Sequence, residues 1–435
     1  MLAPASQATD RPSNTHASTY AFCRAQIGHE WHHLDLIPFF YTMSSSAPNG
    51  GHAPVFIVSA VRTPVGCFQG TLKSQTAIDL GTAATKAAID RAHIKPADID
   101  EAYLGCVLQG NLGQGPARQV VLHAGCPDST EATTVNKICA SGMKALALGA
   151  QSIRLGERDV VLVGGMESMS NAPFYIKRGG LLYGDVPAQD AILRDGLTDA
   201  LHHKPMGLCA EQTAQKYGCT RQEQDAYAIQ SYERAAAAWE RGAFQQEIVP
   251  ITIKGKRGES IVQEDEEYRK LLKDKISTLR PAFDAQCGTI TAANASSLSD
   301  GASALIIASA NAVQKHQLTP IAQVLASADA ACAPVDFSTA PSIAIPQALA
   351  KAGVSADQVA LWEINEAFSV AALANAKILG LDLAKVNTLG GGVSLGHPIG
   401  SSGARIVVTL VHALRPGDIG VAGICNVRLH KDGEA

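Results

Sequence analysis

An internal repeat constrains the fold of this 435-residue chain more than any other feature of its sequence. Gly142 opens a predicted helix that ends near Gly156, and Gly403 opens a second predicted helix that ends near Gly417. The two pairs share one offset, because 403 − 142 and 417 − 156 both equal 261. A repeat of this length predicts two duplicated halves, with further sequence inserted between their matching parts.

The sequence around the repeat alternates predicted strands with predicted helices. Residues 55–58 and 102–108 have the apolar runs of buried strands, and residues 77–93 have the period of a helix. The segment from Arg91 matches the segment from Lys351 at nearly the same offset, since 351 − 91 is 260. We therefore expect an α/β fold whose two halves pack around a pseudo-twofold axis and open onto one shared cleft.

Composition divides the chain into five parts. Residues 1–52 are rich in Ser, Pro, Thr, Asn and Gly without a sustained period, which predicts a disordered leader. Residues 53–171 form the predicted first half, and residues 289–320 return to it. Residues 172–288 combine Gly-rich turns and charged stretches with an amphipathic helix, and we expect them to form a lid over the cleft. The second half is expected over residues 321–435.

Charge and composition exclude several classes of partner. The chain has 36 Lys and Arg against 40 Asp and Glu, so its net charge of −4 gives no basic field for nucleic acid or an anionic membrane. No apolar run approaches the ~20 residues of a membrane helix. The 10 Cys lack the CxxC spacing of a zinc ribbon, and we expect free thiols in a reducing compartment.

The leader bears on localisation. Mitochondrial transit peptides are rich in Arg and poor in acidic residues. Here Arg11 and Arg24 are offset by Asp10, Glu30 and Asp35. We therefore expect a cytoplasmic protein, with mitochondrial import as the alternative.

Cys139 is the first candidate for chemistry. It follows a β-like run and precedes a predicted helix, residues 144–155, whose unsatisfied N–H groups and dipole favour a thiolate. A thiolate in that place is a good nucleophile. The alternative is a packed small hydrophobic residue, which is what most free Cys are.

His397 is the second candidate, in a loop at residues 390–403 that is unusually dense in Gly. The loop lacks the GxGxxG pattern and acidic partner of a dinucleotide site. Under the repeat, 397 − 261 is 136, so His397 occupies the turn equivalent to Asn136, beside Cys139. We therefore expect its imidazole near the thiol, where it would act as a base at neutral pH; a structural His is the alternative.

Two further candidates follow apolar strands. Asn365 comes directly after the predicted strand 361–364, where its amide can orient a water or a His toward an oxyanion, or can cap a helix. Cys425 ends the last apolar strand, and the ends of strands are where α/β sheets bind ligands. Its thiol would shuttle protons, or it is a packed Cys.

Together, four motifs resemble the thiolase family, in its acetyl-CoA acetyltransferase branch. They are VNKICASGMKA around Cys139, GGMESMS from Gly164, NEAF from Asn365 and GGGVSLGHPIGSSGAR from Gly390. The resemblance extends over about residues 54–426. It implies a thiolase fold, with two βαβαβαββ halves and a loop domain, assembled as a homotetramer.

The resemblance also implies a reaction. Cys139 would be the acylated nucleophile, His397 its base and Cys425 the acid and base for the second substrate, while Asn365 would hold a water of the oxyanion hole. Two acetyl-CoA would give acetoacetyl-CoA and CoA, feeding mevalonate and sterol synthesis. The alternative in the same class is a degradative 3-ketoacyl-CoA thiolase.

The binding residues carry over by position. The expected substrate and CoA contacts are Tyr227, Lys270, Lys275, Ser296, Met206 and Phe368. No organic cofactor is expected, but mitochondrial-type members of the family bind potassium. The matching positions here are Tyr227, Ala292, Ala293, Ala295 and Val393. Pro205 departs from the family, because it stands where the substrate loop usually has a His.

The C-terminus also departs from the family. Residues 427–435 replace the expected Gly-rich turn and closing strand, so we expect the C-terminal half to lack its last strand. Val427 stands where the family has a Gly whose N–H serves the second oxyanion hole, and a β-branched residue resists a Gly-only conformation. A poorly active paralogue, or a non-catalytic partner subunit, is therefore a further alternative.

Overall fold

The computed structural model describes residues 20–25, 53–179, 183–256 and 258–425. Val427 and the tail to which it belongs lie outside the described residues, so the expected loss of a closing strand stays a prediction. Ten strands form one curled mixed sheet, which the order of its strands divides into two similar halves.

The N-terminal half of the sheet has the strand order β5-β4-β6-β11-β2, with β3 paired to β11. Strand β4 is parallel to β5 and β6, whereas β11 is antiparallel to β6 and β2. The strands are β2 (Val55–Arg62), β3 (Gly66–Cys67), β4 (Glu101–Gly105), β5 (Glu131–Val135), β6 (Val160–Ser168) and β11 (Ser299–Ser309). The helices are α1 (Ala77–Ala92), α2 (Pro116–His123), α3 (Ser141–Arg154) and α6 (Ala310–Lys315).

The C-terminal half repeats this arrangement with the order β13-β14-β1-β12. Strand β13 is parallel to β14, as β4 is to β6. The strands are β1 (Tyr20–Ala25), β12 (Ala322–Asp329), β13 (Val359–Ile364) and β14 (Ile419–Ile424). The helices are α7 (Pro341–Ala352), α8 (Ser369–Leu379), α9 (Gly392–Leu395) and α10 (Ile399–Ala413). The predicted duplication is therefore confirmed.

Strand β1 is a correction to the sequence-based picture. Its six residues belong to the segment 1–52 that composition predicts to be a disordered leader, yet they pair with β12 on one side and β14 on the other. Two ladders satisfy the backbone groups of a strand whatever its side chains are. The rest of that segment lies outside the described residues.

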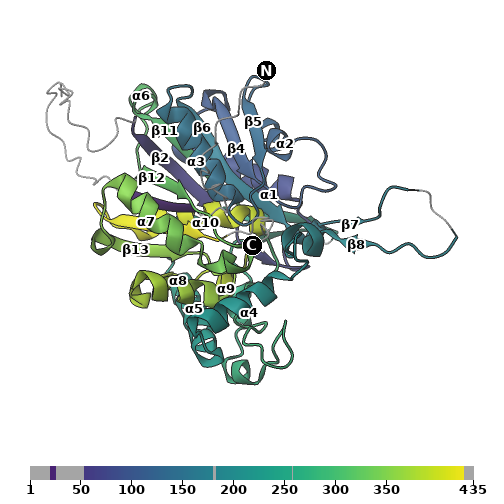
Figure 1. The fold of residues 1–435 in the computed structure, drawn as a ribbon. Coiled ribbons are helices and arrows are strands. Elements are labelled where there is room, and N and C mark those ends of the chain that lie inside the picture. The colour runs from purple at the N-terminus through teal and green to yellow at the C-terminus, as the bar shows by residue number, and fades with distance from the viewer. Residues whose placement is uncertain (1–19, 26–52, 180–182, 257, 426–435) are drawn as a thin grey trace, which may run out of the picture.

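The two central helices, α3 and α10, pack against each other between the two halves of the sheet (Figure 1). Helix α10 is buried from Ile399 to Val411, and the buried stretch includes the charged side chain of Arg405. The helices cross where Gly142 lies against the backbone of Ala404 and Gly403 against that of Met143. Helices α1 and α7 cover the outer faces of their own halves.

The segment between the halves adds two helices and two hairpins (Figure 1). They are β7 (Phe174–Tyr175), β8 (Gln189–Asp190), α4 (Met206–Tyr217), α5 (Arg221–Glu240), β9 (Ile251–Gly255) and β10 (Gly258–Val262). Fully buried Arg62 of β2 fastens the segment to the sheet, through Glu247 at 2.5 Å and Asp265 at 2.7 Å. The domain boundaries themselves stay a prediction.

Short helical segments of three to six residues complete the fold. They are η1 (Pro96–Asp98), η2 (Met169–Asn171), η3 (Ile192–Gly196), η4 (Glu267–Lys270), η5 (Lys273–Thr278), η6 (Pro334–Thr339), η7 (Ala356–Gln358) and η8 (Leu383–Lys385). Within the described ranges, no helix has both the length and the apolar character needed to cross a membrane.

Candidate active site

Cys139 lies on a tight turn immediately before α3. Ile138 has φ of +48°, a left-handed conformation that is costly for a β-branched residue. The hydroxyl of Ser141 holds this turn, because it accepts from the N–H of Lys137 at 2.7 Å and donates to the carbonyl of Ile138 at 2.6 Å. The turn therefore stores strain that is compensated locally, and it fixes the direction of the Cys139 side chain.

His397 lies on the Gly-rich loop before α10. Gly396 has φ of +105°, and a side chain there would collide with Ser299, so this position requires Gly. The backbone N–H of His397 donates to the hydroxyl of Ser299 at 3.2 Å and to the carbonyl of Ser297 at 3.3 Å. The loop thus docks on the start of β11, and it brings a residue of the C-terminal half to the N-terminal half.

The structure brings Cys139 and His397 into direct contact, with Nε2 of the ring 3.2 Å from Sγ. On its other side, Nδ1 lies 2.5 Å from Oγ of Ser402. That hydroxyl donates its proton to the carbonyl of Pro398 at 2.9 Å, so it accepts from Nδ1. The proton of the neutral ring is therefore on Nδ1, and Nε2 presents a lone pair to the thiol.

Burial keeps both groups neutral in the free protein. It lowers the pKa of His397 to about 3, and the charge of Arg405 acts in the same direction. It also raises the pKa of the Cys139 thiol, and neighbouring Cys425 adds to this rise. Burial thus opposes the resting thiolate that the sequence predicts at the helix terminus. The arrangement instead suits proton transfer at the moment when the sulfur attacks.

Cys425 and Asn365 stand side by side at the ends of two paired strands. Cys425 follows β14, is 1% exposed, and has its pKa raised to about 12 by burial. The backbone N–H of Asn365 donates to the carbonyl of Gly423 at 2.9 Å. Both side-chain polar atoms of Asn365 are buried, and neither has a hydrogen-bond partner. Because a buried amide normally has partners, this one is available to a water or a substrate oxygen.

An apolar cluster adjoins these strand ends. It contains Met206 at the start of α4, Phe368 after β13, and Cys425. Phe368 also meets Phe283 edge to face, with ring centroids 6.2 Å apart. Because Tyr227 is in the same cluster, three predicted substrate contacts and one predicted acid-base group are brought together.

The other predicted CoA contacts lie in different environments. Lys270 is half exposed and pairs with Glu266 at 3.8 Å and Glu267 at 3.6 Å, and Lys275 is exposed. The hydroxyl of Ser296 donates to the carbonyl of Ala367 at 2.9 Å. The two lysines are thus on the surface of the inserted segment.

Two of the predicted cation ligands, Tyr227 and Val393, contact the buried carboxyl group of Glu366. It accepts from the hydroxyl of Tyr227 at 2.8 Å and from the N–H of Val393 at 3.1 Å. Ala295 pairs with Phe368, two residues beyond Glu366. Hydroxyl, carboxylate and carbonyl oxygens are the donors that a hard cation prefers. Among the described residues there is no cluster of His, Cys, Asp and Glu arranged to hold a metal ion.

Two family models match the sequence of the chain. The thiolase N-terminal domain matches residues 55–311, and the thiolase C-terminal domain matches residues 318–432. The chain belongs to the thiolase family. It is therefore an acyltransferase with a thiolase fold, as the sequence motifs indicate.

Curated relatives and solved thiolases agree. The mitochondrial acetyl-CoA acetyltransferase of Mus musculus is 53% identical over 373 residues, which cover 86% of this chain and 88% of that protein. The acetyl-CoA acetyltransferase of Yarrowia lipolytica is 53% identical over 371 residues, covering 85% and 93%. A thiolase from Ascaris suum in complex with coenzyme A is 50% identical, with a TM-score of 0.83 over 86% of this chain and 97% of that one.

Three residues of this thiolase site were not predicted from the sequence. Ser402 sets the tautomer of His397, Glu167 joins the two halves, and Glu366 joins the inserted helix α5 to the Gly-rich loop. The two carboxyls are within the quoted motifs GGMESMS and NEAF, so the motifs contain them but do not indicate their partners. Ser402 likewise lies within the quoted motif GGGVSLGHPIGSSGAR, which does not indicate its contact with His397.

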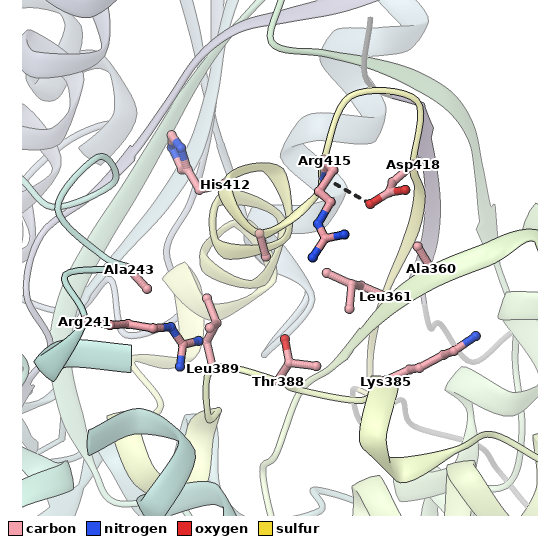
Figure 2. A pocket seen from close by; sticks show the side chains of 11 residues that line it. Arg241, Ala243, Ala360, Leu361, Lys385, Thr388, Leu389, His412, Arg415 and Asp418 are labelled. Carbon is pink, nitrogen blue, oxygen red and sulfur yellow. Dashed lines mark hydrogen bonds between the residues drawn. The ribbon is translucent and has the colours of Figure 1, made fainter. Parts of the chain in front are cut away.

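One cavity of the described residues lies away from this site. It measures about 640 Å³ and is lined by basic side chains that include Arg241, Lys385, His412 and Arg415 (Figure 2). It adjoins the last turn of α10, whereas His397 precedes the first turn. Fifteen residues at about 1.5 Å each separate the two by roughly 20 Å. The acyl-transfer chemistry therefore belongs to the Cys139 site.

Proposed function

We propose that this thiolase is an acetyl-CoA C-acetyltransferase that joins two acetyl-CoA into acetoacetyl-CoA and CoA through an acetyl-Cys139 intermediate. The observation that supports the proposal most is the contact of His397 Nε2 with the Cys139 thiol, in the tautomer that accepts a proton. The similarity to acetyl-CoA acetyltransferases of Mus musculus and Yarrowia lipolytica supports the choice of substrate.

The first half-reaction acylates the enzyme. His397 takes the proton of Cys139 as sulfur attacks the thioester carbonyl, a C–S bond to Cys139 forms, and the C–S bond to CoA breaks. Cys425 gives its proton to the departing CoA sulfur and becomes a thiolate. Because its pKa is raised, this thiolate is a strong base in the apolar cluster.

The second half-reaction forms the carbon–carbon bond. The Cys425 thiolate removes an α proton from a second acetyl-CoA, and the resulting carbanion attacks the acetyl group on Cys139. The bond to sulfur breaks, and His397 returns its proton to Cys139. A water held by the unpartnered amide of Asn365, together with His397, would stabilise the negative carbonyl oxygen.

Labelled acetyl-CoA tests the intermediate. We expect peptide mass spectrometry to find one labelled acetyl group on Cys139 in the wild type and in Cys287→Ala, which removes an exposed thiol. Cys139→Ala should carry no label. An unlabelled wild type with intact folding would contradict the proposal, and would favour the inactive partner subunit that the unusual tail suggests.

A degradative 3-ketoacyl-CoA thiolase is the second candidate. The solved human mitochondrial 3-ketoacyl-CoA thiolase is 39% identical, with a TM-score of 0.80 over 86% of this chain and 99% of that one. Comparing kcat/KM for thiolysis of acetoacetyl-CoA and of a long-chain 3-ketoacyl-CoA separates the two. We expect the four-carbon substrate to be preferred, and a preference for the long chain would overturn this choice.

We extend the proposal to a potassium ion bound near Glu366. Tyr227, Val393 and the backbone of Ala292, Ala293 and Ala295 would hold it, and it would neutralise the carboxylate that links α5 to the Gly-rich loop. The melting temperature should be higher in KCl than in choline chloride at equal ionic strength. Tyr227→Phe should remove this difference and Tyr217→Phe should keep it; no difference in the wild type would exclude the ion.

Assembly, pathway and compartment complete the proposal. A homotetramer is supported by large apolar side chains exposed on the β7–β8 arm, which extends away from the body (Figure 1), and light scattering should give four chain masses.

A role in mevalonate and sterol synthesis predicts that loss of the gene product lowers sterol synthesis. The acidic residues of the leader support a cytoplasmic location over a mitochondrial one, which cell fractionation tests.

A further inference from the structure

The strand between β6 and β2 in the N-terminal half predicts where a strand of the C-terminal half should lie. In the N-terminal half, β11 lies between β6 and β2 and runs antiparallel to both. Strand β6 follows α3, and β11 is the last strand of that half along the chain. The duplication therefore predicts a strand between β14 and β12, antiparallel to both.

Strand β1 fills this place. It is antiparallel to β14 from Tyr20 opposite Ile424 to Ala25 opposite Ile419. It is also antiparallel to β12, again over all six of its residues. The position equivalent to β11 is therefore taken by β1. This strand precedes the N-terminal half in the sequence, whereas a direct equivalent of β11 would follow β14.

Within the described residues, β1 is the only strand that connects β14 to the rest of the sheet. Strand β13 pairs with β14, and β12 pairs with β2, but β12 and β14 do not pair with each other. Helix α7 packs across β1, β12 and β14 together. Removing β1 would therefore leave two unpaired strand edges under this helix, with unsatisfied backbone groups on both.

Strand β1 also pairs with the backbone next to Cys425 and Asn365. Tyr20 is opposite Ile424, the residue before Cys425. Ala21 is opposite Gly423, whose carbonyl accepts from the N–H of Asn365. Loss of β1 would free the strand end that positions both groups.

We propose that residues 20–25 are a permanent strand of the C-terminal half, which the mature protein keeps and does not lose with a cleaved leader. The inference is independent of which thioester the enzyme uses, because it concerns strand pairing alone. It also assigns a structural role to a segment that composition alone marks as dispensable.

Strand β1 can come from the same chain as β2 and β12, and a second copy is not needed to supply it. Ala25 is opposite Gln323 of β12, and Gln323 is opposite Phe56 of β2 on its other side. Two strand spacings therefore separate Ala25 from Phe56, which is about 10 Å. The chain from residue 26 to residue 54 can span far more than this at about 3.3 Å per residue, so its length is sufficient to connect the two strands.

A pair of truncations tests the proposal in the full enzyme. Deletion of residues 2–18 leaves β1 intact, and deletion of residues 2–28 removes it. We expect the first to melt like the wild type and the second to melt lower by more than about 5 °C. Hydrogen exchange should be faster in β12 and β14 of the longer deletion and unchanged in β4 and β5. Equal melting and equal exchange in both deletions would overturn the proposal.

A substitution gives an independent test. Phe22→Pro removes a ladder hydrogen bond from a strand paired on both sides, whereas His33→Pro adds the same residue between β1 and β2. We expect only Phe22→Pro to lower the melting temperature, and a peptide of residues 16–29 to restore part of the loss in the longer deletion. Acetyl labelling of Cys139 is measured in parallel, so that a wrong substrate assignment is distinguishable from a wrong strand assignment.

Two measurements on the unmodified chain decide the matter even if the variants do not fold. Backbone amides of residues 20–25 should exchange slowly, and protein isolated from its own cells should begin before Tyr20. Rapid exchange there, or a mature N-terminus beyond Ala25, would refute the proposal.

Discussion

Nε2 of His397 lies 3.2 Å from Sγ of Cys139, across the junction between the two halves of the duplicated fold. Each residue is held by its own turn, so the contact depends on how the halves pack. The thiol is neutral at rest and its pKa is raised, so its reactivity depends on a base that is already in contact with it.

Replacing His397 should remove most of the catalytic rate. We expect His397→Gln to lower kcat by about 10²- to 10⁴-fold, because general base catalysis typically contributes that much. Its melting temperature at pH 7.5 should change little, since the ring is neutral there. Steady-state rates and calorimetry check this, and a variant with wild-type kcat would exclude His397 as the base.

Ser402 is a positioning residue for the same ring. Ser402→Ala removes the acceptor for Nδ1–H, so we expect kcat to fall about 5- to 100-fold, the cost of one lost or unsatisfied hydrogen bond. KM should stay close to that of the wild type. Ser401→Ala is the matched control, because this neighbouring buried Ser contacts Ser303 and not the ring. Equal losses in both variants would point to a general effect on α10.

Glu167 should matter through the backbone groups it binds. Its carboxyl accepts from the N–H groups of Val107 at 3.0 Å, Leu108 at 3.1 Å and Gly400 at 3.0 Å, which ties the end of β4 to the start of α10. The amide nitrogen of Gln cannot accept, so Glu167→Gln should lower the free energy of unfolding by about 1–3 kcal/mol. Glu240→Gln, at an exposed site, should leave it unchanged. Denaturant titration of both variants makes the comparison.

A buried carboxyl in the C-terminal half should make stability depend on pH. Burial raises the pKa of Glu363 to about 8 from an ordinary 4.5, although Arg405 lies 3.8 Å away and opposes the rise. The folded state then holds a proton that the unfolded state has lost. This contribution is complete below pH 4.5, and it declines as pH rises toward 8 by roughly 1.4 kcal/mol per unit.

Glu363→Gln removes this dependence, because Gln resembles the protonated acid at every pH. The variant should therefore gain stability relative to the wild type as pH rises from 5 to 8, and melting curves across that range measure the gain. A variant that instead becomes relatively less stable toward pH 8 would indicate an ionised Glu363 paired with Arg405.

The repeat explains why part of the site could be predicted from sequence. Equivalent turns of duplicated halves meet at the pseudo-twofold axis, so the offset of 261 places His397 beside the turn of Cys139 without any coordinates. Asn365 and Cys425 follow from the same argument, because both end strands. The order of residues along the chain is sufficient to predict that these side chains lie near Cys139.

Other features depend on energies that local sequence does not express. Strand β1 forms because a slot between two distant strands satisfies its backbone, and nothing in its own composition indicates that slot. The raised pKa of the Cys139 thiol results mainly from burial, which several elements of the fold provide together. Long-range packing thus decides both strand pairing and ionisation.

The crossing of the central helices offers a last test of the symmetric arrangement. A Cβ at Gly403 would lie 2.6 Å from the backbone nitrogen of Met143, and one at Gly142 would lie 2.8 Å from that of Ala404. Neither neighbour is a flexible side-chain end, so Gly403→Ala must push α10 away from α3. Overpacking of this kind typically costs about 1–3 kcal/mol.

The same shift should impair catalysis, because Cys139 and His397 are attached to the two helices that separate. A displacement of about 1 Å can cost about 10²-fold in rate. We therefore expect Gly403→Ala to lose both melting temperature and kcat, whereas Gly179→Ala, with nothing within 4 Å of the added Cβ, should keep both. If Gly403→Ala melted lower but retained full kcat, the contact between thiol and imidazole would not depend on how closely the helices cross.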